Sequence, residues 1–449
     1  MNRPRLAWVG DDFTGASDTL ATLAEGGARA LLFLDVPTEA RLAAAGPLDA
    51  VGVATAVRSM DPPSMRAVLR PIGAWLARSG IPLLHYKVCS TWDSAPQVGS
   101  IGEAVRTLWS PEWAPWVPLV GGQPSLGRWC VFGQLHAQAG VGGPVFRIDR
   151  HPTMSRHPVT PMDEADLARH LARQDLAPVT AIDWRLLETT DDRLDTALRA
   201  ALGADPAGTA SRPRPVLFDT LHAAHLATIG RALARHATSR PLLAVGASSV
   251  AQAALAAWRA DGTLRAGDAA APAPVAPADG PVFVLAGSLS PMSARQVERA
   301  SRYERMALDA ARLAAGDAAY RETVASAIAA RLAAGAHLLA GTALGTDAPA
   351  AADPALAPAC GALLAQVLAR ARCARVGVIG GDTSSRAVQA LAPWALGWVG
   401  RIGSGTPVVR ARADDPSVDG LELMLKGGQM GEADVLDRLV EGEPRGTAG

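Results

Sequence analysis

Residues 6–25 read LAWVGDDFTGASDTLATLAE, and this stretch sets the fold expected for the whole chain. A short apolar run stops at two adjacent aspartates, Asp11 and Asp12, and a Phe-Thr-Gly-Ala-Ser turn leads into a run of helical periodicity. A continuous apolar strand, a tight polar turn and an amphipathic helix in this order are typical of an α/β unit. In such units the parallel strands are buried on both faces.

Three later segments repeat this design: PLLAVGASSVAQAALAAWRA at 241–260, PVFVLAGSLSPMSARQVERA at 281–300 and RVGVIGGDTSSRAVQALAPWAL at 375–396. We therefore predict an α/β protein with two α/β domains, each with a mainly parallel sheet flanked by helices. The Ala/Pro-rich run at 266–280 is typical of a linker between an N-terminal domain, 1–265, and a C-terminal domain, 281–449. Ligands in such folds bind at the carboxyl ends of strands, where the polar turns fall.

Composition excludes several classes of protein. The 449 residues are 49% hydrophobic and carry no formal net charge, so neither nucleic acid nor an anionic membrane surface is an expected partner. No apolar run reaches the roughly 20 residues of a membrane span, and no signal peptide is evident. The cysteines form no CxxC pair, which argues against zinc and disulfides. We expect a cytoplasmic, enzyme-sized protein.

Lysine is the rarest charged residue, since only Lys87 and Lys426 among 43 basic residues are not arginine. If coding bias replaces lysine wherever arginine will serve, the two survivors mark places that need a compact ammonium. Lys87 opens the stretch KVCSTWDS after the predicted strand IPLLHY, where Ser90 and Thr91 add hydroxyl donors for a small oxygen-rich anion. A plain polar loop is the alternative. We interpret Cys89 as an inert thiol, because no histidine is patterned with it.

Glycine- and serine-rich turns suggest a second anion site. GGDTSS at 380–385 joins a strand to a helix, whose unpaired amides attract phosphate. AGSLS at 286–290, GASSV at 246–250 and Lys426 in LKGGQMG are expected to join it in a polyphosphate pocket. Ordinary capped turns are the alternative. Because the Walker and GxGxxG patterns are absent, a nicotinamide-dependent oxidoreductase is disfavoured.

The opening aspartates allow two interpretations that are compatible with each other. One of them is expected to cap the helix that starts near Thr14. Two carboxylates at a strand end can also accept hydrogen bonds from a polyol and take the proton of an attacking hydroxyl. Arg58, after the run VGVATAV, is placed to hold a substrate carboxylate in bidentate fashion.

Six ordered motifs, DDFTGASD, HYKVCSTWDSAPQVGSIG, TPMDEADL, GSLSPMSARQ, GGDTSS and LKGGQMG, resemble the four-carbon acid sugar kinases over residues 6–437. The resemblance implies a sugar-acid-binding N-terminal domain, a nucleotide-binding C-terminal domain and an active site in the cleft between them. It implies phosphorylation of a threonate, erythronate or 3-oxo-tetronate by ATP with Mg²⁺. By similarity, the acid sugar would contact Asp12, Arg58, Lys87, Cys89, Ser90 and Thr91. By similarity, ATP would contact Ser288, Gly380, Gly381, Asp382, Thr383 and Gly428.

Within this hypothesis Asp12, or Asp11, orients and deprotonates the attacking hydroxyl, and Lys426 steadies the transferred phosphoryl group or is structural. The chain departs from the family's usual GSSG, GGxTSG and KSGNFG, reading GASS, GGDTSS and KGGQMG. These turns keep their glycines and hydroxyls, so nucleotide binding is still expected. The stretches RIDRHPTMSRHP and CSTWDS resemble a distinct branch, so a kinase for 3-oxo-isoapionate is an alternative. A non-catalytic sugar-acid and nucleotide sensor is an alternative of another class. A homodimer is left open, because no apolar seam fixes the oligomeric state.

Overall fold

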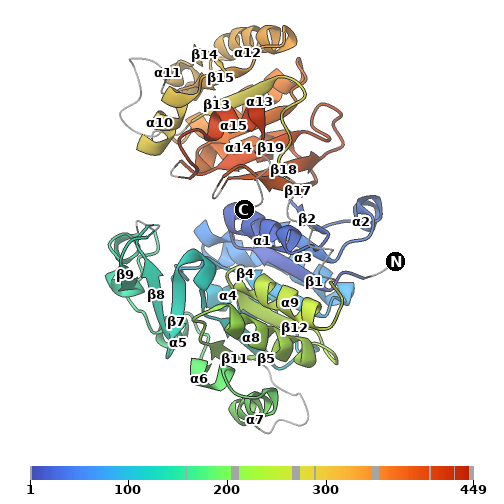
Figure 1. The fold of residues 1–449 in the computed structure, drawn as a ribbon, viewed down its shortest axis with the longest axis vertical. Helices are drawn as coiled ribbons and strands as arrows, with labels where there is room; N and C mark the ends of the chain where they lie inside the picture. The colour runs from blue at the N-terminus through green and yellow to red at the C-terminus, as the bar shows by residue number, and fades with distance from the viewer. Residues whose placement is uncertain are drawn as a thin grey trace, which may run out of the picture. The chain divides into compact units, whose positions relative to one another are not determined.

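The computed structural model describes residues 3–140, 142–157, 159–203, 212–264, 274–287, 290–342, 344, 353–403, 406–428 and 430–443. The chain forms two compact units, Met1–Ala270 and Ala271–Gly449. Each contains a mainly parallel sheet with helices packed against it, so the predicted α/β class is confirmed (Figure 1).

In the first unit, parallel strands lie in the order β10-β11-β5-β12-β4-β1-β3-β2. Their bounds are β1 (Leu6–Gly10), β2 (Ala30–Phe33), β3 (Ala50–Ala54), β4 (Leu83–Lys87), β5 (Trp116–Val120), β10 (Thr180–Ile182), β11 (Arg214–Phe218) and β12 (Leu242–Gly246). The helices are α1 (Phe13–Glu25), α2 (Glu39–Ala45), α3 (Pro62–Ser79), α4 (Ile101–Leu108), α5 (Leu167–Ala172), α6 (Trp184–Leu187), α7 (Asp191–Leu202), α8 (Ala223–His236) and α9 (Ser249–Ala260).

The connections of this sheet reverse direction at its centre. From β1 the chain crosses β3 to reach β2, whereas from β3 it crosses β1 to reach β4. Right-handed crossovers therefore place α1 and α3 on opposite faces. In agreement, α1 packs on α9 and α9 on α8, while α3 packs on α4. The carboxyl ends of β1, β3 and β4 thus meet at a topological switch point, where α/β folds bind ligands.

A small antiparallel sheet follows β5, with β6 (Gly122–Gln123), β7 (Arg128–Val131), β8 (Gln134–Gln138) and β9 (Val145–Arg147). The 3₁₀ turn η2 (Pro124–Leu126) joins the first two strands. The strand–turn–helix pattern is recognisable only where a helix follows the strand. Because a hairpin follows β5, the pattern does not predict this antiparallel sheet.

In the second unit, strands lie in the order β17-β18-β19-β16-β13-β15-β14. Their bounds are β13 (Val282–Ala286), β14 (Glu304–Ala307), β15 (Leu338–Gly341), β16 (Arg375–Ile379), β17 (Ala395–Arg401), β18 (Pro407–Arg412) and β19 (Glu422–Lys426). The helices are α10 (Pro291–Arg299), α11 (Ala310–Ala314), α12 (Ala318–Ala333), α13 (Leu356–Leu368), α14 (Gly381–Leu391) and α15 (Val435–Glu441). β18 runs antiparallel to both β17 and β19, and the remaining pairs are parallel.

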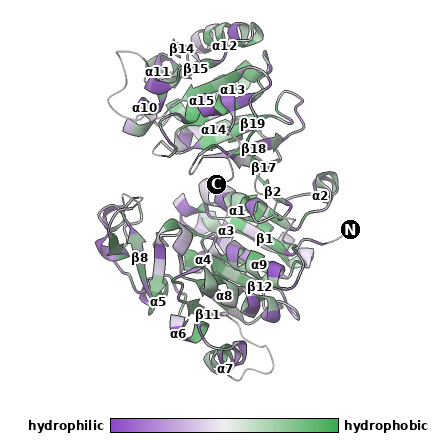
Figure 2. Cartoon of the chain, in the orientation of Figure 1, coloured by the Kyte–Doolittle hydropathy of each residue, from purple (hydrophilic) through white to green (hydrophobic). Residues whose placement is uncertain are grey.

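The cores are built from the continuous apolar strands (Figure 2). Every residue of β1, β4, β5, β12, β13 and β16 is buried, as expected for parallel strands covered on both faces. The Trp8 side chain lies where a Cβ on Gly52 of the neighbouring strand would overlap it, so the large ring depends on that glycine. No helix in the described ranges is long and apolar enough to span a membrane.

The predicted linker at 266–280 lies partly outside the described residues. Its second half is packed: Val275 is buried in the core of the second unit, and its carbonyl accepts a hydrogen bond from Glu443 N at 2.8 Å. Residues at the end of the Ala/Pro run therefore belong structurally to the second unit. The exact domain limits stay a prediction.

Candidate active site

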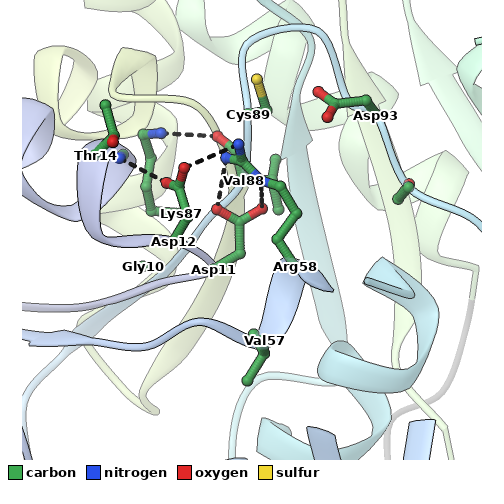
Figure 3. Close-up of polar contacts among 12 residues, drawn as sticks. Gly10, Asp11, Asp12, Thr14, Val57, Arg58, Lys87, Val88, Cys89 and Asp93 are labelled. Carbon is green, nitrogen blue, oxygen red and sulfur yellow. Dashed lines mark hydrogen bonds and ion pairs between the residues drawn. The ribbon is translucent and has the colours of Figure 1, made fainter. Parts of the chain in front are cut away.

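The two aspartates at the end of β1 have different environments (Figure 3). Asp12 is the N-cap of α1, and its Oδ1 accepts a hydrogen bond from Gly15 N at 2.6 Å. Its side chain is 28% exposed, whereas that of Asp11 is 6% exposed. The capping interpretation is thus confirmed for Asp12, which also keeps a surface that a ligand can reach.

Arg58 ties both carboxylates together. Its Nε and Nη2 donate to Asp11 Oδ2 and Oδ1 at 3.1 and 2.9 Å, and its Nη1 lies 2.9 Å from Asp12 Oδ2. Burial lowers the pKa of Arg58, but the negative charges of Asp11 and Asp12 hold it above its ordinary value. Burial raises the pKa of the Asp11 carboxyl, and Arg58 opposes that rise. The bidentate edge of Arg58 is engaged by Asp11, and its contact with a substrate carboxylate stays a prediction.

Lys87 ends β4 beside these residues. Backbone bonds join the strand ends: Asp11 N donates to Lys87 O, and Arg58 N donates to Asp11 O, each at 2.9 Å. Lys87 Nζ is buried and donates to Val88 O at 2.9 Å. A Cβ on Gly15 would lie 2.6 Å from both Lys87 Nζ and Asp12 Oδ1. Glycine at this position therefore lets the ammonium approach the Asp12 carboxylate.

The loop after Lys87 is a hydrogen-bonded chain of polar groups. Cys89 Sγ lies 2.9 Å from Thr91 Oγ1, and that hydroxyl donates to Asp93 Oδ1 at 2.5 Å. Burial, with the Asp93 charge, raises the pKa of the Cys89 thiol to about 11. Cys89 is therefore a neutral thiol near pH 7, which supports its interpretation as inert. Ser90 lies in the same turn.

The GASSV turn corrects one expectation. It follows β12 in the first unit, where Gly246 is in register with Lys87, and does not lie in the nucleotide half of the chain. Its Ser248 donates to Asp18 Oδ2 at 2.5 Å and lies 3.0 Å from the Thr19 hydroxyl. The turn thus joins α9 to α1 at the carboxyl edge that holds the aspartates. Sequence alone does not show which strands are neighbours.

In the second unit the other three turns do converge, because β13, β16 and β19 are adjacent. Gly287 N donates to Ile379 O, and Gly380 N donates to Lys426 O, each at 2.9 Å. Gly380 adopts a φ of +122°, a backbone conformation that glycine adopts readily and other residues rarely do. Gly381 begins α14, and no atom lies within 4 Å of the position that a Cβ would occupy there. These features leave the backbone of the turn open to a phosphate.

Further hydrogen bonds fix the LKGGQMG turn that follows β19. The hydroxyls of Ser290 and Ser293, in the first turn of α10, donate to Gly428 O at 2.5 and 2.9 Å. Thr383 is buried where a Cβ on Gly287 would overlap it, and Asp382 lies exposed at the start of α14. Ser288 lies outside the described residues.

Lys426 ends β19 as Lys87 ends β4. It is 2% exposed, and its Nζ donates to Gly427 O at 3.1 Å. Burial lowers the pKa of Lys426 to about 8. Lys426 forms no ion pair with any of the described residues. Its ammonium is therefore a desolvated cation with little charge compensation, which favours the binding of an anion.

The comparisons with known proteins agree with this geometry. A sugar-binding N-terminal domain model matches residues 6–254, and a nucleotide-binding C-terminal domain model matches residues 283–436. The chain belongs to the four-carbon acid sugar kinase family. The aspartate cluster lies in the sugar-binding part of this family's architecture, and the glycine turns around Lys426 lie in the nucleotide-binding part.

Members of this kinase family with similar sequences match over almost their full length. A Paraburkholderia graminis 3-oxo-isoapionate kinase is 37% identical over 98% of this chain and 95% of its own. A 3-oxo-tetronate kinase of Methylobacterium radiotolerans is 33% identical over 97% of this chain and 98% of its own. A solved Salmonella typhimurium structure superposes with a TM-score of 0.75 at 25% identity, covering 96% of this chain and 98% of that one.

Sequence reasoning missed several residues of this edge: Gly15, Asp18, Ser248, Gln123 and Arg128. The GGQ sequence that follows β5 was a usable clue, since Gly121 and Gly122 come directly after a buried strand. The GGQ sequence did not lead to a predicted site, because a hairpin follows β5 there instead of a helix.

Proposed function

We propose that this chain, an ATP-dependent sugar-acid kinase, phosphorylates a hydroxyl of an oxidised sugar acid of the 3-oxo-isoapionate kind. The expectation from sequence put tetronates and 3-oxo-tetronates first and 3-oxo-isoapionate second. The 37% identity to a 3-oxo-isoapionate kinase, against 33% to a 3-oxo-tetronate kinase, favours the second. A sensor without catalysis is disfavoured, because the relatives named here are kinases over their whole length.

The observation that carries the proposal is the state of Asp12. Its carboxylate is fixed by Gly15 N and Arg58, yet it remains the exposed member of the pair beside Lys87. A hydroxyl donating to this carboxylate would be oriented for attack and could release its proton there. Lys87 and Arg58 would offset the gathered negative charge. Phosphoryl transfer needs mainly such positioning and charge neutralisation.

On the nucleotide side, the amides around Gly380 and Gly381 and the Lys426 ammonium would bind the ATP phosphates. Asp382 fits a role in holding Mg²⁺, because a carboxylate with phosphate oxygens is a common ligand set for this ion. Asp382 is exposed and forms no ion pair within the described part of the chain. The bound ion would neutralise phosphate charge during transfer.

A coupled ADP-release assay tests the proposal. The panel contains 3-oxo-isoapionate, 3-oxo-tetronates, D-threonate and erythronates with Mg-ATP. We expect the highest kcat/KM for 3-oxo-isoapionate. Higher turnover of a 3-oxo-tetronate would restore the first expectation, and ATP binding without turnover of any acid would contradict a kinase for this substrate class.

A further inference from the structure

An acid sugar carries a carboxylate, and the one guanidinium of the site described so far is already engaged. Both edges of Arg58 are engaged by Asp11 and Asp12. Lys87 Nζ is buried and donates to Val88 O. A carboxylate taken from water needs a positive partner with good hydrogen-bond geometry. A second guanidinium at the same edge of the sheet would offer that geometry.

The turn after β5 lies at that edge. Val120, the last residue of β5, is in register with Gly246 of β12, which is in register with Lys87 of β4. The chain leaves β5 through Gly121 and Gly122 and forms the hairpin β6–η2–β7. Gln252 Nε2, in the first turns of α9, donates to Ser125 Oγ at 3.0 Å and fastens this hairpin above the β12 turn.

Arg128 is the first residue of β7, and half of its guanidinium forms no hydrogen bond with the described residues. Its Nη1 donates to Leu126 O and Gly127 O at 2.6 and 3.2 Å. Its Nε is buried and has no hydrogen-bond partner, and no carboxylate of the described residues pairs with it. Burial lowers the pKa of Arg128, so the unused edge belongs to a partly desolvated guanidinium.

Gln123 adds an unused acceptor next to this donor. It is directly opposite Arg128 in the antiparallel pair of β6 and β7, so the two side chains share a face. Gln123 is 2% exposed, and its Oε1 has no partner. A buried donor and a buried acceptor left unpaired side by side are costly unless a ligand satisfies both.

We propose that Arg128 binds the carboxylate of the acid sugar through its Nε and Nη2 edge and that Gln123 accepts a hydrogen bond from a neighbouring substrate hydroxyl. The inference rests on the proposed function and deepens it by assigning the acid-recognising residues. The Nε–Nη2 edge of a guanidinium matches the two oxygens of a carboxylate, as Arg58 demonstrates with Asp11. Asp12 would then contact the hydroxyl end of the same molecule.

The test measures the affinity of each panel acid and of its primary amide by calorimetry, without ATP. We expect the wild type to prefer the acid. Arg128→Gln should weaken acid binding by about 10- to 100-fold, the range for a hydrogen bond to a charged group, and leave amide binding nearly unchanged. Arg128→Lys should recover part of the loss. Arg29→Gln is the matched control, because among the described residues this exposed arginine of the same unit pairs with Asp49 alone.

Kinetics and a second variant make the test decisive. In the ADP-release assay, Arg128→Gln should raise KM for the acid by a similar factor while kcat changes by less than about threefold. Gln123→Glu places a carboxylate beside Arg128 and should lower acid affinity even if Arg128→Gln fails to fold. An acid-to-amide preference that survives in these variants, or a wild type that binds none of the acids, would overturn the proposal. Binding of an acid without ADP release would instead contradict only the kinase function.

Discussion

Asp12 combines two roles that are usually assigned to different residues. As the N-cap of α1 it satisfies an amide that the helix leaves unpaired, and as the exposed carboxylate of the pair it remains available to a ligand. Asp11 is committed to Arg58 and buried. The structure therefore favours Asp12 over Asp11 as the group that accepts the substrate proton, a choice that the sequence left open.

Asp12→Asn should reduce kcat by about 10²- to 10⁴-fold, because the amide cannot accept the proton. Stability should change little, since asparagine also caps helices well. ATP affinity, measured by calorimetry, should be unchanged. Asp61→Asn is the matched control: Asp61 caps α3 through Ser64 N at 2.8 Å and should leave turnover intact. Near-normal turnover of Asp12→Asn would exclude the proposed role.

Lys426→Met should stabilise the protein while weakening ATP binding at least about tenfold. The folded pKa near 8 lies below the ordinary value of 10.5. The cost of burying the ammonium is thus fully present below pH 8, shrinks between pH 8 and 10.5, and disappears above. Below pH 8 the variant should gain up to about 3 kcal/mol in unfolding free energy. Chemical denaturation at pH 7 and pH 10 checks this, and an equal gain at both would contradict the cause given.

The sequence predicted the positions of the candidate residues better than it predicted their partners. Lys87 and Lys426 stand out by composition alone, and each is the last residue of a strand, the fully buried β4 and the partly buried β19. The partner of Arg58 could not be predicted, because Asp11 is 47 residues away and becomes a neighbour only when β1 and β3 pair. Gln123 and Arg128 carry no local pattern that separates them from ordinary hairpin residues.

Among the elements, the strand–turn–helix units were predictable because each is encoded within about 20 consecutive residues by period and turn chemistry. The order of the strands was not. GASSV resembles the turns of the nucleotide half but lies beside β4, since long-range pairing and not local sequence decides which turns meet. The hairpin after β5 was missed for a different reason, because no helix follows that strand to complete the strand–turn–helix pattern.

Gly287→Ala tests the convergence of the nucleotide turns. The added methyl would overlap Thr383, so the end of β13 and the first turn of α14 must separate. We expect KM for ATP to rise by about 10-fold or more, with the Kd for the acid sugar unchanged, because about 1 Å of misplacement is costly in a positioning site. Gly280→Ala is the control, since its Cβ would meet only Ala374 at an ordinary 3.5 Å. An unchanged KM would show that these two turns do not position ATP.

For the whole molecule, the proposal assigns the acid sugar to the first unit and ATP to the second. Transfer requires their reacting atoms to meet. We predict that the radius of gyration measured by small-angle X-ray scattering falls only when both ligands are present, with a non-hydrolysable ATP analogue preventing turnover. A value independent of ligands would contradict domain closure. The same measurement gives the molecular mass and so decides whether the chain forms the homodimer that the sequence leaves open.

The scarcity of lysine has a practical consequence. A protease that cleaves only after lysine has two targets in the chain, one at the end of a central strand in each unit, and both side chains are buried. Cleavage at each target therefore requires local or global opening of that unit, and the fragments report which unit opened first. The chain thus carries a built-in unfolding reporter for each half, and it needs no engineered label.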